Sequence, residues 1–206
     1  AERAMALFAS TSPSYLILRS LDLLNERLAS DLPQELRDCA AALDKLKHEL
    51  TQHGFSLVGA EPLKLTVFAK PYGYTGYELA DFLAQKKLIA EMADPDHTVM
   101  MFAPAGGIES INAVKDALLS LPRREALTDA PPAFSLPERV LSLHEALFTP
   151  SETLPLDACE GRVLAAPTVS CPPAVPIAVC GERLDRHTLA LMRYYGQTTC
   201  QVVKEH

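Results

Sequence analysis

The chain has 206 residues, of which 48% are hydrophobic, so it can bury the core of one large domain or of two small ones, and we favour two. Its net charge of −7 argues against a nucleic-acid surface, because neutralising phosphates requires clustered lysine and arginine. The sequence has no apolar run long enough to cross a membrane and no signal-peptide pattern at its start. We therefore expect a soluble, cytoplasmic protein without nucleic-acid or membrane partners.

Hydroxyl side chains gather before the first predicted helix, at Ser10, Thr11 and Ser12. The next residue is Pro13, which is favoured in the first helical position, so Ser12 is the expected N-cap of a helix over residues 13–29. The free N–H groups and the positive dipole end of such a helix can also bind a phosphate. Two interpretations of these hydroxyl residues therefore stay open: they cap the helix only, or they also bind an anion. The apolar stripe of this helix consists of Ile17, Leu21, Leu24 and Leu28.

A second helix follows Pro33 and ends at the C-cap signal His53-Gly54. We expect the first two helices to pack as a hairpin. From residue 55 the apolar residues alternate with polar or small ones, which predicts strands near residues 55–57 and 63–68. The next helix begins at Thr75, where Thr75 and Glu78 fit a capping box.

Further along, residues 89–92 and 98–103 are expected as strands, and a helix is predicted around residues 111–118. The order of helices and strands predicts an open sheet with helices on one face, which is an α+β arrangement. Four prolines between residues 121 and 137 indicate a linker. The expected organisation is a first region over residues 1–121, a linker over 122–137 and a small α+β domain over 138–206.

The small C-terminal domain is predicted to hold one helix over residues 140–147 and a closing helix over residues 185–195, with strands at 169–170 and 177–179. Glu182 follows Gly181 after an apolar run, in a loop position where functional residues are often found. The simpler interpretation is a carboxylate at the start of a helix, which the helix dipole favours.

The five cysteines are odd in number and form no Cys-x-x-Cys pair, which argues against a disulfide framework and against a zinc site. The six histidines show no i, i+4 pair on one predicted helix, so we predict no metal. Reduced, buried thiols are expected at Cys39, Cys159, Cys171, Cys180 and Cys200.

Three blocks of sequence, in this order, resemble the Orn/Lys/Arg decarboxylases, the pyridoxal-phosphate enzymes of basic amino acids. The resemblance extends from residue 8 to about residue 203. The first block is Ser-Thr-Ser-Pro-Ser-Tyr at residues 10–15, together with the apolar stretch and the Ser-Leu-Asp that follow it. The second block is Gly-Tyr-Thr-Gly-Tyr-Glu-Leu at residues 73–79, together with Glu-Met-Ala-Asp-Pro at residues 91–95. The third block comprises Gly-Arg-Val at residues 161–163, Cys-Pro-Pro-Ala-Val-Pro at residues 171–176 and Gly-Glu-Arg at residues 181–183.

The resemblance implies the small domain of the aspartate-aminotransferase fold, followed by the family's C-terminal domain. It also implies a homo-oligomer whose active site forms between two subunits, where Ser10, Thr11 and Ser12 reach the cofactor phosphate of the neighbouring chain. Glu182 is implied to lie by the active-site entrance and to face the distal cation of lysine, ornithine or arginine. The implied reaction is α-decarboxylation, with pyridoxal phosphate accepting the electrons that are freed when CO2 leaves.

The same comparison predicts that this chain lacks a catalytic residue. In the family, a lysine that follows a histidine holds the cofactor, and no His-Lys dipeptide occurs here. Most lysines of this chain are expected to be solvated, in turns or on polar helix faces. We therefore expect the C-terminal part of a decarboxylase, without the N-terminal large domain that would be its partner and without activity by itself. The sequence departs from the family pattern at Arg19, Cys171, Ala174 and Cys180, which points to an altered pocket.

Two alternatives stay open. One is a degenerate, non-catalytic homologue that acts as a dimerisation or binding module. The other is a different fold-type-I lyase or transferase, which an assay of CO2 release against amino-group transfer would distinguish.

Overall fold

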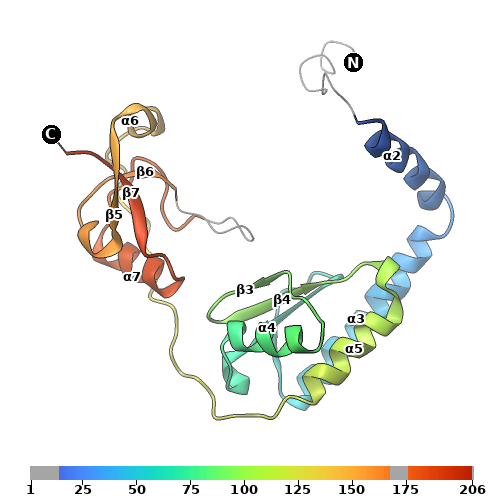
Figure 1. Cartoon of the computed structure of the whole chain (residues 1–206). Coiled ribbons are helices and arrows are strands. Elements are labelled where there is room, and N and C mark those ends of the chain that lie inside the picture. The colour runs from blue at the N-terminus through green and yellow to red at the C-terminus, as the bar shows by residue number, and fades with distance from the viewer. Residues whose placement is uncertain (1–13, 168–175, 206) are drawn as a thin grey trace.

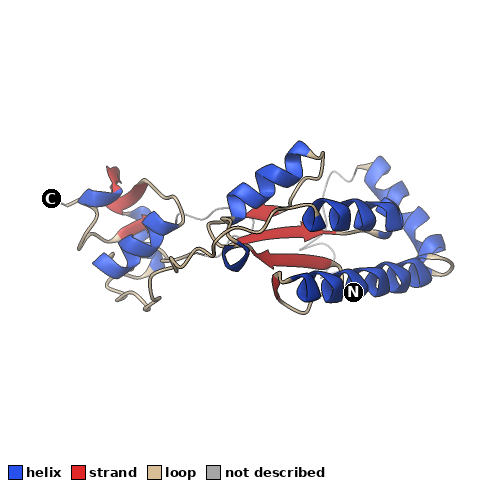
Figure 2. Cartoon of the chain, turned by 90° about the horizontal axis from the view of Figure 1, so that it is seen from below, coloured by secondary structure: helices blue, strands red, loops and turns tan. Residues whose placement is uncertain are grey.

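The computed structural model describes residues 14–167 and 176–205. Two units follow one another along the chain, each with its own antiparallel sheet, and an irregular segment joins them (Figure 1). Figure 2 shows the strands of the first unit alongside helices, with the second unit beyond the loop-rich connection. The α+β class predicted from the sequence is confirmed.

The sheet of the first unit has the strand order β1-β2-β4-β3. Its central strands are β2 (Lys64–Phe68) and β4 (His97–Met101), with β1 (Ser56–Val58) and β3 (Met92–Ala93) at the edges. In β2 the buried Leu65 and Val67 alternate with half-buried residues, so one face is covered more completely than the other. The expected strand over 89–92 is shorter and later than predicted, because only two residues pair with β4.

Three helices pack on the covered face of this sheet: α3 (Leu32–His53), α4 (Gly76–Gln85) and α5 (Gly107–Leu119). The end of α3 is the one predicted, because Gly54 adopts the left-handed conformation that closes a helix. The start of α4 is also confirmed: Thr75 and Glu78 each accept a hydrogen bond from the other's backbone N–H. A 3-10 turn, η2 (Pro104–Gly106), leads into α5.

The first helix, α2 (Tyr15–Leu28), does not form the expected hairpin with α3. It has no buried residue and projects away from the rest of the unit (Figure 1). Its N-cap position is Ser14 rather than Ser12, and the Ser14 side chain makes no capping hydrogen bond. Large apolar side chains of α2 are therefore open to solvent, including Ile17 at 61% exposure and Leu21 at 54%.

The segment predicted as a linker is irregular, but its first part lies against the first unit. This part of the segment runs alongside the 3-10 turn η1 (Lys70–Tyr72). The backbone N–H groups of Arg124 and Leu127 donate hydrogen bonds to carbonyls of that turn. The hydroxyl of Tyr74 also donates to the carbonyl of Pro122, at 2.6 Å. Several hydrogen bonds therefore hold the start of this segment in place.

The second unit contains a sheet that the sequence analysis missed, with the order β5-β7-β6. Its strands are β5 (Ser151–Pro155), β6 (Leu164–Ala166) and β7 (Thr199–Val203), and β5 is followed by the 3-10 turn η3 (Leu156–Ala158). The predicted strand at residues 177–179 is wrong, because the chain bends there; the one at 169–170 lies outside the described residues.

The helices of the second unit are α6 (Leu143–Phe148) and α7 (Arg186–Tyr194). α6 begins later than predicted because Ser142 and Glu145 form a capping box. The prediction for α7 is confirmed, with Asp185 as its N-cap. Within the described residues, no helix combines the length and the apolar character needed to cross a membrane.

Candidate functional site

The predicted phosphate-binding residues Ser10, Thr11 and Ser12 lie outside the described residues. Their proposed role in binding a cofactor phosphate stays a prediction.

Glu182, the predicted substrate residue, lies in a turn that precedes α7 by several residues. Its carboxylate Oε2 accepts the backbone N–H of Val179 at 2.7 Å, and its own N–H donates to the Val179 carbonyl at 3.2 Å. The helix-start interpretation is therefore wrong, since Asp185 caps α7 instead. One oxygen of Glu182 closes the turn, and the side chain is half-buried. A role at the active-site entrance remains a prediction.

Gly181 holds this turn against the rest of the second unit. Its N–H donates to Leu164 at 2.8 Å, and its carbonyl accepts from Val140 and Leu141. The backbone has a φ of +87°, and a Cβ would lie 2.3 Å from the carbonyl oxygen of Leu141. The presence of glycine and then glutamate at these positions thus has a structural explanation. The glycine lets two chain segments approach closely, and the glutamate that follows it closes the turn.

A polar cluster, formed by the buried Lys70 and Asp96, the half-buried Tyr194 and Asp129, whose side chain is 64% exposed, connects the two units. The ammonium of Lys70 lies 2.8 Å from Asp96 Oδ1 and 2.6 Å from Asp129 Oδ2, and it also donates to the hydroxyl of Tyr194. That hydroxyl donates in turn to Asp96 Oδ1 at 2.6 Å. We call these four residues the Lys70 cluster.

The Lys70 cluster brings four segments together. Lys70 lies in η1, Asp96 in the turn between β3 and β4, Asp129 in the connecting segment and Tyr194 at the end of α7. Lys70 is 1% exposed and Asp96 is 2% exposed. Lys70 is thus an exception to the expectation that most lysines are solvated.

The charges of the Lys70 cluster stabilise one another. Burial alone lowers the pKa of Lys70, but its hydrogen bonds to Asp129, Asp96 and Tyr194 outweigh burial and raise that pKa above its ordinary value. Burial, and then the hydrogen bond to Asp96, raises the pKa of Tyr194. At neutral pH the cluster therefore contains an ammonium and a neutral phenol. Lys70 is not a nucleophile, since a nucleophilic lysine needs a lowered pKa.

Asp94, Asp96 and His97 are close enough to share a cation, because their ligand atoms lie within 4.8 Å of one another. Each of these side chains already has a polar partner, however, although the buried Oδ2 of Asp96 accepts no hydrogen bond from the described residues. Asp94 Oδ1 accepts the N–H groups of Asp96 and His97 at 2.7 and 2.6 Å, and Asp96 pairs with Lys70. This is a turn stabilised by an aspartate, next to a fixed positive charge that would repel a metal.

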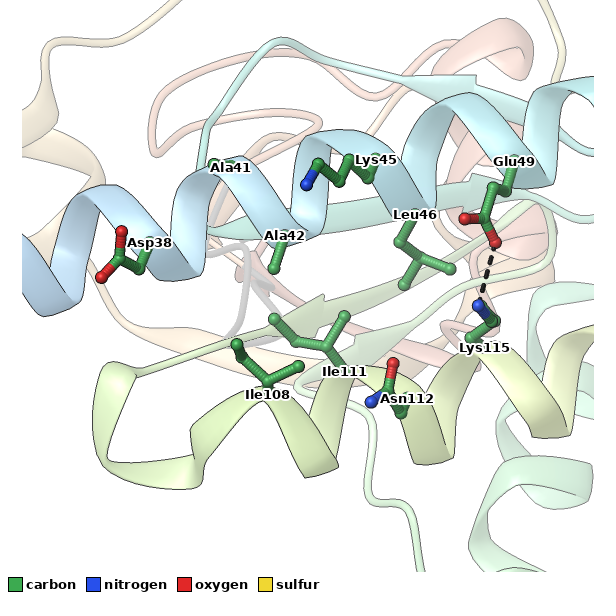
Figure 3. Close-up of a pocket in the computed structure, with 10 residues that line it drawn as sticks. All are labelled: Asp38, Ala41, Ala42, Lys45, Leu46, Glu49, Ile108, Ile111, Asn112 and Lys115. Carbon is green, nitrogen blue, oxygen red and sulfur yellow. Dashed lines mark ion pairs between the residues drawn. The ribbon is translucent and has the colours of Figure 1, made fainter.

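Two surface hollows accompany these features. A groove of about 410 Å³ lies between α3 and α5, where Ile108 and Ile111 face Ala42, and the ion pair of Lys115 with Glu49 lies at one end (Figure 3). A second hollow, of about 420 Å³, lies on the less covered face of the first sheet and includes Val58 and Met101. Neither gathers converging catalytic groups; both leave apolar side chains in contact with solvent.

Curated relatives of this chain are arginine decarboxylases and an uncharacterised protein. The chain is 24% identical over 205 residues to the arginine decarboxylase of Bacillus subtilis strain 168, covering 90% of this chain and 42% of the relative. It is 28% identical to the uncharacterised protein YaaO of the same organism, covering 87% of this chain and 40% of that protein. The chain thus spans less than half the length of these relatives.

Solved lysine decarboxylases share the fold. The constitutive lysine decarboxylase of E. coli matches 98% of this chain with a TM-score of 0.63 at 16% identity, over 45% of its own chain. Lysine decarboxylase A of Pseudomonas aeruginosa matches the same share with a TM-score of 0.60 at 15% identity, over 44% of its chain. The family model of the Orn/Lys/Arg decarboxylase C-terminal domain matches residues 132–204. Residues 132–204 therefore match the Orn/Lys/Arg decarboxylase C-terminal domain, and the chain shares the fold of the matching part of lysine decarboxylases.

Proposed function

We propose that this chain is the C-terminal portion of a pyridoxal-phosphate-dependent decarboxylase of a basic amino acid. One observation carries the proposal: the match to lysine decarboxylase structures covers 98% of this chain and only 45% of the E. coli enzyme. The arginine decarboxylase of B. subtilis is matched over a similar share. A chain of this kind supplies a sheet unit and a C-terminal domain to an enzyme whose remaining part holds the cofactor.

Pyridoxal phosphate, when bound, supplies an electron sink for the loss of CO2. In the proposed enzyme, Ser10, Thr11 and Ser12 bind its phosphate, and Glu182 orients the substrate through the distal cation. The described part of this chain offers no amine suited to hold the cofactor covalently. Lys70 is the one buried lysine of the described residues, and its carboxylate partners keep it protonated. The covalent anchor is therefore expected in the missing large domain.

Exposed apolar side chains support the proposal that other protein domains or subunits pack against this chain. α2 has no buried residue, and Val58 and Met101 on the less covered sheet face are 48% and 57% exposed. Exposed large apolar side chains gathered on one helix or one sheet face indicate a protein interface. We propose that the large domain and a second subunit cover it, as expected for a homo-oligomer.

Mixing the 206-residue chain with pyridoxal phosphate and recording the visible spectrum tests the proposal. We expect neither a stoichiometric absorption band of a covalent lysine adduct nor CO2 release from arginine, lysine or ornithine. A stoichiometric band that is lost on changing one particular lysine would contradict the assignment as a part without the cofactor lysine. The full-length gene product should release CO2 from at least one of these substrates. Amino-group transfer would favour another fold-type-I enzyme, and no reaction at all would favour a non-catalytic binding module.

A further inference from the structure

We propose that the Lys70 cluster is a latch that fixes the position of the C-terminal unit on the sheet unit, with Tyr194 as its closing group. The inference rests on geometry within this chain and does not depend on the proposed enzymatic role. In this proposal, four residues that lie far apart in the sequence together fix the relative position of the two units.

Tyr194 is the member of the cluster that belongs to the C-terminal unit. It is the last residue of α7, and its hydroxyl accepts from Lys70 and donates to Asp96 across the boundary between the units. The end of α7 accordingly lies beside the turn between β3 and β4 (Figure 1). One hydroxyl thus carries two hydrogen bonds from the C-terminal unit to the first sheet.

The connecting segment belongs to the same latch. Asp129 accepts from the Lys70 ammonium through its backbone carbonyl at 2.9 Å and through its carboxylate at 2.6 Å. The Lys70 carbonyl accepts the N–H of Leu127 at 3.0 Å. The chain is therefore tied to η1 immediately before it leaves for the C-terminal unit, which shortens the tether between the two units.

A polar contact built around a buried ammonium suits this task better than an apolar one. An ammonium that is 1% exposed loses its hydration, so its three N–H donors need partners in a precise arrangement. Asp96, Asp129 and Tyr194 supply them when the units are docked. An apolar contact tolerates sliding and rotation, whereas the Lys70 ammonium has its full set of partners in one relative orientation. In some proteins a buried polar or ionic group sets register in this way, often without adding net stability.

The small size of the C-terminal unit makes a fixed contact with the sheet unit important for its stability and position. Among its described residues the buried core cluster is small, with nine members, and units of about 70 residues are marginally stable by themselves. Docking on the sheet unit orients α7 and the turn that carries Glu182. The cluster therefore sets where the C-terminal unit stands relative to the rest of the chain.

The test compares Tyr194→Phe with Tyr195→Phe in the 206-residue chain. Both substitutions remove one hydroxyl and keep the ring, and the two rings are neighbours, 5.2 Å apart between centroids. Small-angle X-ray scattering on the dilute monomer fraction measures the separation of the units. Amide hydrogen exchange of β7 peptides reports how often the C-terminal unit opens. For Tyr194→Phe we expect a larger radius of gyration and exchange that is about 5- to 30-fold faster, with an unchanged far-ultraviolet circular dichroism spectrum.

Two further variants complete the experiment. Tyr194→Ala removes the ring as well and should separate the units more fully. Lys70→Met should act in the same direction, whereas Lys64→Met, which removes a half-exposed lysine paired with Glu61, should not. The latch is refuted if Tyr194→Phe and Tyr194→Ala both keep the wild-type radius of gyration. It is equally refuted if the wild-type scattering already corresponds to units that move independently.

Discussion

Removing the charge of Asp96 should destabilise the protein strongly, although Asp96 lies in the short turn between β3 and β4 and not within a helix or strand. The substitution Asp96→Asn keeps the shape but leaves Lys70 beside a neutral group. Both side chains of this ion pair are nearly inaccessible, at 2% and 3% exposure. Removing one partner of a buried pair costs about 3–5 kcal/mol. Because Asp129 stays beside the ammonium, we expect a value near the lower end, about 3 kcal/mol.

Urea unfolding followed by circular dichroism measures this effect. With a denaturant dependence of about 2 kcal/mol per molar, the midpoint should fall by about 1.5 M. The matched control is Asp22→Asn, which removes an aspartate paired with Arg19 at 3.0 Å on the surface of α2, with both side chains more than half exposed. That midpoint should stay within about 0.3 M of the wild type. Equal midpoints for Asp96→Asn and Asp22→Asn would show that the buried Lys70 does not need the charge of Asp96, which would refute this reasoning.

The remaining predictions concern pH, substrate binding and self-association. Lys70 and Tyr194, which face the carboxylates of the cluster, both have a raised pKa in the folded state, so their stabilisation is complete below the unfolded pKa values and is lost as the pH rises. The difference in thermal midpoint between wild type and Tyr194→Phe should therefore shrink above about pH 10; a constant difference from pH 7 to 11 would refute this reasoning. In the complete enzyme, Glu182→Gln should lower kcat/KM roughly 10- to 150-fold, as expected for a charge-assisted hydrogen bond, while the glutamine oxygen still accepts from the turn; a change of less than twofold would leave Glu182 with only its structural role. Sedimentation of the 206-residue chain should show concentration-dependent association that Leu21→Lys with Leu24→Lys reduces, and a strict monomer at high concentration in the wild type would count against α2 as a contact surface.

Elements with local signals were predictable from the sequence. The left-handed Gly54 at the end of α3, the reciprocal Thr75 and Glu78 bonds of α4 and the alternating Leu65 and Val67 of β2 were all indicated by residues a few positions apart. The resemblance to decarboxylases rested on short blocks of the same kind, and the match to residues 132–204 bears it out for the C-terminal domain.

Pairings over long separations were not predictable in this way. β5 pairs with β7 through Leu154 and Cys200, and no local pattern connects these strands. The Lys70 cluster joins residues up to 124 positions apart, and in the sequence Lys70 is an ordinary lysine in a turn. The orientation of α2 is a further case, because the amphipathic pattern predicts an apolar stripe without saying what covers it.

The sequence by itself therefore determined the class of the fold, the ends of its best-capped helices and the family of its C-terminal domain. Only the tertiary structure decided which charges are buried together and which part Glu182 plays in its turn. The physical reason is the sequence distance over which each kind of interaction acts. Capping bonds and apolar periodicity act within one or two turns of chain, so a short stretch of sequence contains all their partners. The state of a buried ammonium depends on partners that only folding brings within 3 Å, and a lysine that would be solvated in its local segment becomes the centre of the contact between two units.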